Sequence, residues 1–270
     1  ALTAAAFQEM LDVCAACGVR LMDGTMFMHG RRYEALAALL GTSDAAITGA
    51  PARVYAPFSF NSDAAFLKTN IRVSPQGDPL GALGDLGWYS IRLGLIAFGW
   101  SRPESARARV LRSIDGVPTE VEATITMDSS RDTPRVLSIF CSFHRTFQQR
   151  FEICTDAERI ISCDDFVLPY SERKPGPMVV RVSKGPSAYA TIMDVRDEVL
   201  DLGADNQEAN MWDSFAQLVA GAGASGGAWS AVSAGLTPEV AALRTQAVVD
   251  LVLSASRSDG DEVPFGSLPW

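Results

Sequence analysis

The stretch 80–92 reads LGALGDLGWYSIR and leads into an apolar run that continues to residue 98. Its glycines precede and open that run, which predicts a close backbone approach followed by a helix. Asp85 is expected at the N-cap or in the first turn of this helix. Tyr89 lies four residues on and Arg92 three beyond that, so the helix would place an acid, a phenol and a guanidinium on one face. This face is the first candidate site.

The composition favours a globular protein with a full core, because 47% of the 270 residues are hydrophobic. The formal charge of -9, without a basic stripe, argues against nucleic acid as a partner. No apolar stretch is long enough for a membrane span. Five cysteines, mostly inside apolar segments, indicate a reducing compartment, either the cytoplasm or an organelle interior such as a chloroplast. Cys14 and Cys17 have no second pair to complete four ligands, so we expect no metal.

The N-terminal segment has the pattern of half a βαβ unit. Thr3 is expected to cap a helix over about residues 4–17, with Gly18 closing it in the left-handed conformation. The apolar run 19–22 predicts a short buried strand. The strand that should precede this helix is missing from the chain. We interpret residues 1–30 as the remnant of a Rossmann-type domain that is lost or unrecorded, and residues 31–270 as an α+β domain.

Two polar connections carry further candidate site residues. The loop 23–32, DGTMFMHGRR, follows the predicted strand at the end where open α/β sheets usually bind ligands. That position favours His29 as a site residue; the alternative is a surface or capping histidine ahead of a helix over 32–40. The long connection 61–79 contains Phe66, Lys68 and Arg72. Loops of this length are usually disordered or functional, and its apolar residues predict that it packs near the glycine-rich stretch.

The remaining pattern predicts the fold class. A strand over 53–60 is followed by alternating segments separated by turn signals, at 107–114, 121–127, 135–143, 147–154, 159–163 and 178–182. Successive strands with short turns predict an antiparallel meander. We therefore expect an α+β fold: an open, mostly antiparallel sheet covered on one face by helices, including helices at 207–220 and from Thr237 onward. The other face would expose an apolar patch, which predicts a homo-oligomer or a larger assembly through the open sheet face.

Several of these segments resemble a known family. The matching residues are MDGTMFMH at 22–29 followed by Arg32, FLK at 66–68, IRV at 71–73 and GALGDLGWY at 81–89. They are similar to the glucose-fructose oxidoreductase and inositol dehydrogenase family, in its dimeric dihydrodiol dehydrogenase-like branch. The resemblance implies an N-terminal Rossmann domain that binds NAD or NADP, followed by an α+β substrate and dimerisation domain. It implies that this chain is the second part only, without the nucleotide fingerprint and the catalytic lysine.

The resemblance also implies roles for individual residues. Tyr89 would be the catalytic tyrosine, relaying a proton to or from the substrate oxygen, with Asp85 as its catalytic neighbour. The substrate-binding candidates are His29, Arg32, Lys68, Arg72 and Arg92. A free phenol has a pKa of about 10, so without a cation beside it Tyr89 would be a weak base near neutrality. The chain alone is expected to bind no cofactor. If a Rossmann half is supplied, the resemblance implies that the protein binds NADP or NAD.

Two functions follow from this interpretation. The first is the substrate-binding and oligomerisation half of an NAD(P)-dependent oxidoreductase-like protein. It would act on the carbinol or carbonyl of a small sugar or diol, and would not be catalytically competent as the chain stands. The alternative is a non-catalytic scaffold or peripheral subunit of a larger assembly. The loosened turn at 29–32, which reads HGRR where relatives have His-x-Pro-Arg, favours the alternative, and Tyr89 would then be a packing residue.

Overall fold

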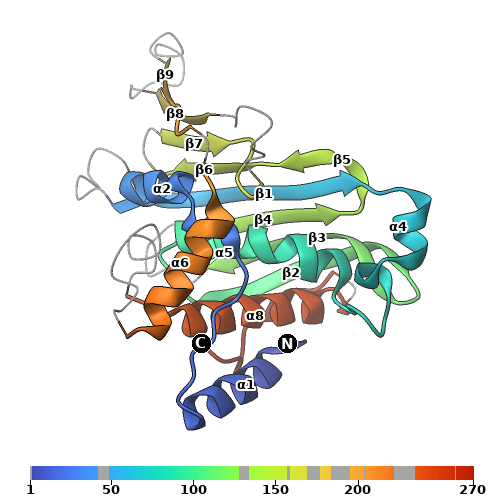
Figure 1. Cartoon of the computed structure of the whole chain (residues 1–270). Helices are drawn as coiled ribbons and strands as arrows, with labels where there is room; N and C mark the ends of the chain where they lie inside the picture. Colours follow the sequence, from blue (N-terminus) through green and yellow to red (C-terminus); the bar gives the residue numbers. More distant parts are fainter. Residues whose placement is uncertain are drawn as a thin grey trace.

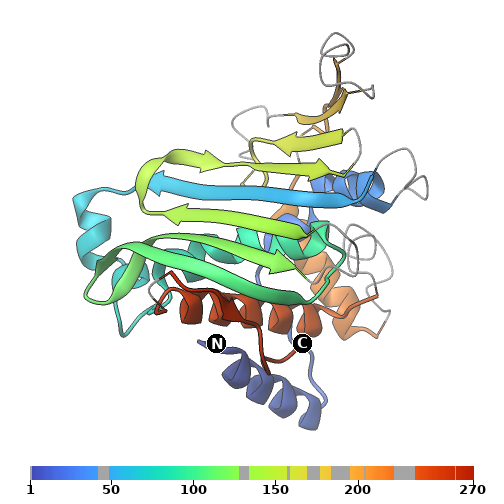
Figure 2. The same cartoon turned by 180° about the vertical axis from the view of Figure 1, so that it is seen from behind.

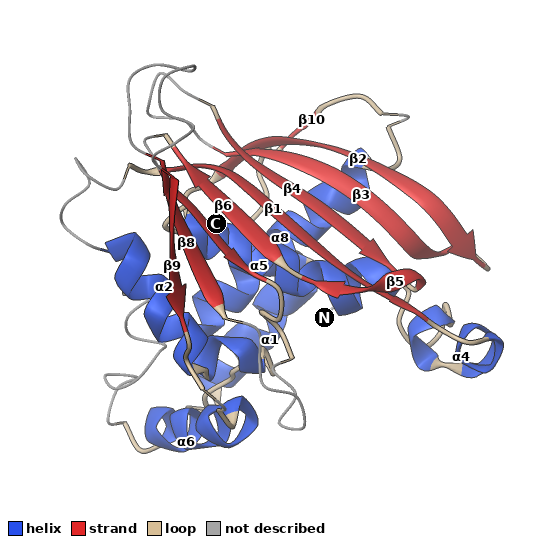
Figure 3. Ribbon diagram, turned by 90° about the horizontal axis from the view of Figure 1, so that it is seen from above, coloured by secondary structure: helices blue, strands red, loops and turns tan. Residues whose placement is uncertain are grey.

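The computed structural model describes residues 2–41, 49–127, 134–156, 159–168, 177–183, 195–203, 205–221, 235–258 and 260–270. A large open sheet forms the centre of the protein, and helices cover one of its faces (Figure 1). Seen from above, these helices lie on the same side of the curved sheet (Figure 3). The α+β fold expected from the sequence, with an open and mostly antiparallel sheet, is confirmed.

The described strands are β1 (Pro51–Asn61), β2 (Pro103–Ile114), β3 (Val117–Met127), β4 (Arg135–Ser142), β5 (His144–Gln149), β6 (Phe151–Thr155), β7 (Arg159–Cys163), β8 (Met178–Ser183), β9 (Val195–Leu200) and β10 (Val263–Pro264). The described helices are α1 (Ala4–Ala16), α2 (Arg31–Gly41), α4 (Ala64–Thr69), α5 (Trp88–Ala97), α6 (Gln207–Val219) and α8 (Pro238–Ala255), with 3-10 turns η1 (Met26–His29) and η2 (Ile71–Val73) and a π-helical turn η3 (Leu83–Gly87). The helices expected at 4–17, 32–40, 207–220 and from Thr237 are all present. The glycine-rich stretch 221–227 lies outside the described residues beyond Gly221.

The sheet has the order β10-β2-β3-β4-β1-β6-β7-β8-β9, and β5 pairs with β1. β1 pairs parallel with β4, from Arg53 opposite Val136 to Ser59 opposite Ser142, so the expected antiparallel meander is wrong at this point. The strand β1, which comes first in the sequence, lies between β4 and β6, which are close to each other in the sequence. This insertion creates the parallel pair of β1 and β4. The single strand expected at 147–154 is two strands, β5 and β6, which are separated at Arg150. The sequence pattern also missed β9.

The glycine-rich stretch begins its helix earlier than expected. Helical backbone starts at Gly81, so Asp85 does not cap the helix; it is the acidic residue in the first turn of the π-helical segment η3, which was the other position expected for it. Gly81 has a φ of +52°, and a Cβ at this position would lie 2.2 Å from the carbonyl oxygen of Pro118. Only glycine fits such a conformation and such a close approach. The glycine therefore fixes where the helix meets β3.

The N-terminal helix α1 packs on the outer side of α8 (Figure 1). Thr3 caps it, and Gly18 follows it with a φ of +64°, as the sequence predicts. The backbone N–H of Ala4 donates to Asp250 Oδ2 at 2.6 Å. The strand expected at 19–22 is absent, and Val19 is 53% exposed. A lone segment has no neighbouring strand here to complete its backbone hydrogen bonds, so it stays irregular.

The opposite face of the sheet is not covered by helices (Figure 2). A hollow on this face is lined by charged and polar side chains, among them Arg107, Arg109, Glu122 and Thr124, and by apolar groups that include Phe140 and the ring of Tyr55. In this region the uncovered face is therefore mixed in polarity, and contact with a partner through it stays a prediction. Within the described ranges, no helix is long and apolar enough to cross a membrane.

Candidate active site

A cavity of about 500 Å³ lies on the helix-covered side of the sheet. Its wall is formed by the strands β1 and β5, the turns η1, η2 and η3, the helices α4 and α5, and the segment after β7. The lining residues are Met26, Phe58, Phe60, Phe66, Arg72, Asp85, Leu86, Tyr89, Phe147, Val167 and Leu168. The connection 61–79 therefore packs beside the glycine-rich stretch, as expected.

Three polar side chains meet in this wall. Asp85 lies in the π-helical turn, Tyr89 follows it at the start of α5, and Arg72 comes from η2. The guanidinium of Arg72 donates through Nε to Asp85 Oδ1 at 2.7 Å. Single π-helical turns occur frequently at functional sites, because they interrupt the regular helix and re-aim its side chains. The structure thus brings together an acid, a phenol and a cation, but the cation is Arg72.

The electrostatics keep Tyr89 protonated. Burial, followed by the negative charges of Asp85 and Asp23, raises the pKa of Tyr89 to about 12, although Arg72 and Arg92 oppose this rise. Burial also raises the pKa of Asp85 above its usual range, while the hydrogen bond from Arg72 holds it down. At neutral pH the Tyr89 phenol therefore carries its proton and is suited to donate it.

The Tyr89 side chain is held by aromatic neighbours and keeps a weak polar contact. Its ring centroid lies 5.9 Å from those of Phe27 and Phe58. Its hydroxyl donates to the Met26 sulfur at 3.5 Å. A thioether is a weak acceptor, so a ligand oxygen could replace this contact at small cost. The phenol is thus fixed in place, and its proton is weakly engaged.

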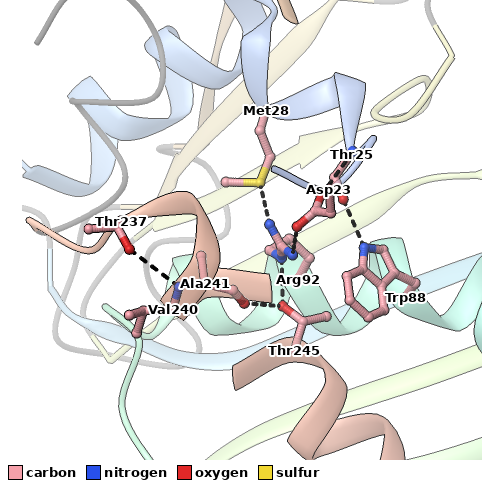
Figure 4. A network of polar contacts seen from close by, with 9 residues as sticks. All are labelled: Asp23, Thr25, Met28, Trp88, Arg92, Thr237, Val240, Ala241 and Thr245. Carbon is pink, nitrogen blue, oxygen red and sulfur yellow. Dashed lines mark hydrogen bonds and ion pairs between the residues drawn. The ribbon is translucent and has the colours of Figure 1, made fainter. Parts of the chain in front are cut away.

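Arg92 does not belong to the cavity, although the sequence placed it on the face of Asp85 and Tyr89. Its side chain is 1% exposed and lies within a separate polar network (Figure 4). Nη2 donates to Asp23 Oδ2 at 2.7 Å and Nε donates to Thr245 Oγ1 at 2.6 Å. A π-helical turn contains more residues than an α-helical turn. The turn η3 therefore increases the angle between Asp85 and Arg92 around the helix axis, and the two side chains point in different directions. Arg92 therefore joins the loop before η1 to α5 and α8.

The other predicted substrate-binding residues are not among those that line the cavity. His29 is buried, with Nδ1 3.0 Å from Ser214 Oγ on α6, and burial lowers its pKa to about 4. It is neutral at physiological pH. Arg32 donates through Nη1 to the backbone oxygen of Asp165. Lys68 is exposed on α4. Of the seven residues predicted for the site, the cavity gathers Asp85, Tyr89 and Arg72.

Sequence reasoning missed the apolar wall of the cavity. Phe58 and Phe60 share one face of β1, and this alternation was visible in the sequence. Phe147 on β5 gave no such signal, because its role depends on β5 folding back beside β1. The resemblance marked Phe66 only as part of a motif. Of these, Phe147 is the residue that only long-range strand pairing brings to the site.

The described residues do not form a Rossmann-type dinucleotide site. A Rossmann-type site needs a parallel strand that runs through a glycine-rich turn into a helix N-terminus. Residues 19–22 form no strand, and in the described part of the sheet the parallel pair is β1 with β4. Nor do the described His, Cys, Asp and Glu residues form a group that could hold a metal ion.

No family model matches the sequence. Solved structures match its fold over nearly the whole chain. An aldose-aldose oxidoreductase from Caulobacter crescentus, complexed with glycerol, matches with a TM-score of 0.74 and 16% identity, covering 98% of this chain and 69% of that chain. A 3-ketoreductase from Actinomadura kijaniata, in complex with NADP and TDP-benzene, matches with a TM-score of 0.70 and 20% identity, covering 94% and 68%.

The chain shares the fold of these oxidoreductases. A UDP-N-acetylglucosamine 3-dehydrogenase from Acidithiobacillus ferrooxidans also has this fold, with a TM-score of 0.68 and 18% identity over 95% of this chain and 69% of that chain. The neighbours belong to the glucose-fructose oxidoreductase and inositol dehydrogenase family, which agrees with the resemblance seen in the sequence. At these identities the likeness establishes the fold, and the chemistry depends on the site itself.

Proposed function

We propose that this chain is the substrate-binding and oligomerisation half of an NAD(P)-dependent oxidoreductase-like protein. Its cavity would hold a small carbinol or carbonyl compound, of the sugar or diol class, with the reacting oxygen at Tyr89. The observation that carries this proposal is the position of Tyr89, beside the Arg72–Asp85 pair in the wall of a cavity of about 500 Å³. Cavities of this size commonly bind small ligands.

In this proposal Tyr89 acts as a general acid. When a carbonyl is reduced, negative charge develops on its oxygen, and a phenol with its proton still bound can neutralise that charge. The raised pKa of Tyr89 supports this direction, because the phenol remains protonated at neutral pH. The Arg72–Asp85 pair would orient the ligand and balance charge beside it. Hydride would have to come from a nicotinamide held outside the described residues.

The outer side of α1 supports contact with a further domain or subunit. Met10 and Val13 on this helix are 44% and 63% exposed, and Leu2 and Val19 at its ends are also more than half exposed. Contiguous exposed apolar side chains usually mark an interface. We further propose that residues 1–30 are the remnant of a Rossmann-type unit and residues 31–270 the α+β substrate and dimerisation domain, as the resemblance to the dimeric dihydrodiol dehydrogenase-like branch implies.

The alternative proposal is a non-catalytic scaffold or peripheral subunit derived from such an oxidoreductase. Two observations favour it. The ring of Tyr89 packs between aromatic neighbours, and the described side chains that line the cavity include no cation other than Arg72. A tyrosine of this kind could be retained because its ring fills space between Phe27 and Phe58. In that case the cavity would bind no small carbonyl compound.

A paired titration of the 270-residue protein separates these proposals. NADPH binding is followed by nicotinamide fluorescence, and binding of a panel of small ketones, diols and sugars is followed by calorimetry. The oxidoreductase proposal predicts that a member of the panel binds, that Tyr89→Phe weakens this binding, and that Tyr55→Phe on the other face of the sheet does not. It predicts no saturable NADPH binding at micromolar concentration. If no panel member binds, the scaffold proposal is favoured.

A further inference from the structure

The segment 165–168 contributes to the wall of the Tyr89 cavity, although it lies outside the strands of the sheet. It follows β7, and the side chains of Val167 and Leu168 line the cavity. A segment of this kind has no continuous strand ladder to bond its backbone groups, so those that are buried need other partners. Its position therefore depends on the residues that bind its backbone.

Gln149 supplies such partners. It is the last residue of β5 and is 1% exposed. Its Oε1 accepts from the backbone N–H of Val167 at 3.1 Å and of Leu168 at 2.6 Å, and its Nε2 donates to the Leu168 carbonyl oxygen at 2.9 Å. The backbone N–H of Phe166 donates to the Gln149 carbonyl oxygen at 3.1 Å. One glutamine thus binds four backbone groups of the segment, three of them through its side chain.

A second buried glutamine binds the same segment from α6. Gln207 begins this helix, is 3% exposed and donates through Nε2 to the Val167 carbonyl oxygen at 2.7 Å. Removing one partner of a buried hydrogen bond is costly, because the group left behind has no water to replace it. The two amides together hold the segment in one position.

The ring of Phe166 connects the segment to Tyr89. Its centroid lies 5.6 Å from that of Phe27 and 6.4 Å from that of Phe58. These two rings also pack against Tyr89, each with its centroid 5.9 Å from that of the phenol. Because protein interiors are closely packed, a shift of the segment would disturb both aromatic neighbours of the phenol.

We propose that Gln149 is a positioning residue for Tyr89: its amide fixes the segment 165–168, and this segment fixes the rings and the wall beside the phenol. Gln149 itself is not among the residues that line the cavity. It acts through hydrogen bonds to backbone groups, so an apolar side chain of similar length cannot replace it. The inference rests on the proposed function for the role of Tyr89, but the positioning can be tested without a ligand.

The test compares Gln149→Met and Gln207→Met with the wild-type 270-residue protein in NMR spectra, with ¹³C at the tyrosine Cζ atoms and no ligand present. Methionine has a similar length but no amide, so the variants remove three and one of the hydrogen bonds to the segment. We expect the Tyr89 signal to shift in both variants, and further in Gln149→Met. The signal of Tyr55, on the opposite face of the sheet, should stay in place.

Two control variants separate positioning from stability. Gln148→Met changes the adjacent residue, which is paired with Ser59 and points to the other face of β5, so it should leave the Tyr89 signal unchanged. Val180→Ala removes methyl groups from the core on β8, so it should lower the melting temperature without moving the Tyr89 signal. If Gln149→Met behaves like Val180→Ala, its role is stability alone and the inference is overturned.

Gln207→Met decides the question in the same way if Gln149→Met does not fold. A shift of the Tyr89 signal in Gln148→Met as large as that in the other two variants would also overturn the inference. Calorimetric titration with cyclohexanone, 1,2-propanediol and D-glucose tests the proposed function separately. If one of these compounds binds the wild-type protein, Gln149→Met should weaken its binding about tenfold, because the site loses preorganisation.

An equal affinity of wild-type protein and Gln149→Met would overturn the inference and leave the proposed function standing. If none of the three compounds binds, the scaffold proposal is favoured, and the NMR comparison without ligand alone decides whether Gln149 positions Tyr89.

Discussion

Arg72 and Asp85 are joined by a 2.7 Å hydrogen bond between Nε and Oδ1, across 13 residues of sequence. This pair fixes η2 against the π-helical turn η3, directly beside Tyr89. It also sets the charge next to the phenol, because the carboxylate of Asp85 raises the pKa of Tyr89 and the guanidinium of Arg72 lowers it. The protonation of Tyr89 therefore depends on both partners.

The first prediction concerns the pKa of Tyr89. Asp85→Asn removes a negative charge that raises this pKa, so the pKa should fall below the value of about 12. Arg72→Met removes a positive charge that lowers it, so the pKa should rise. Ultraviolet difference titration at 295 nm, with Tyr89→Phe subtracted, measures both changes. Shifts of the same sign in the two variants would contradict this account.

The second prediction concerns stability at low pH. The unfolded histidine binds a proton as pH falls through about 6.5, whereas buried His29 resists protonation until about pH 4. The unfolded state therefore binds more protons in this window, and the free energy of unfolding should fall as pH drops from 6.5 to 4, by about 3 kcal/mol. His29→Gln should flatten this part of the stability profile in urea melts. An equally steep profile in the variant would exclude His29 as the cause.

The third prediction concerns the Arg92 network. Arg92→Met leaves Asp23 without its ion-pair partner and should destabilise the protein by about 3 kcal/mol. Asp23→Asn should also destabilise it, because a buried guanidinium loses its counter-charge. The double variant should be less destabilised than the two single effects added together, by about 1 to 3 kcal/mol. Chemical denaturation of the four proteins measures this coupling, and strict additivity would show that the contact contributes nothing.

The fourth prediction concerns the contact between α5 and β4. A Cβ on Gly94 would lie 2.4 Å from a methyl carbon of buried Leu137, so Gly94→Ala should cost about 1 to 3 kcal/mol. Gly41 ends α2, and a Cβ added there would meet no described heavy atom within 4 Å, so Gly41→Ala should be neutral or slightly stabilising. Thermal melts compare the two. An equal loss in both variants would contradict close packing at Gly94.

Much of the fold followed from local patterns. Alternating segments located β2, β3, β4, β7 and β8, and the capping residues Thr3 and Thr237 located the starts of α1 and α8. The parallel pairing of β1 with β4 did not follow, since strand order depends on contacts between distant segments. The prediction of a strand at 19–22 was wrong: the segment has the composition of a strand, but no strand of the described sheet lies beside it to pair with it.

The site was predictable in part. Asp85, Tyr89 and Arg72 were identified from the sequence, but the cation was assigned to Arg92 because regular helical spacing was assumed. The π-helical turn is not encoded by any simple spacing rule, and it changes which side chains share a face. Phe147 reaches the cavity through the pairing of β5 with β1, which no local pattern reveals.

The central claim is that the Tyr89 hydroxyl faces the ligand oxygen inside the cavity. The most direct measurement is the NMR spectrum of protein labelled with ¹³C at the tyrosine Cζ atoms, assigned with Tyr→Phe variants and recorded during titration with the panel of small ketones, diols and sugars. We predict that the Tyr89 signal shifts in a saturable manner, while that of Tyr55, on the opposite face of the sheet, does not move. A Tyr89 signal that stays unchanged while a member of the panel binds would contradict the account.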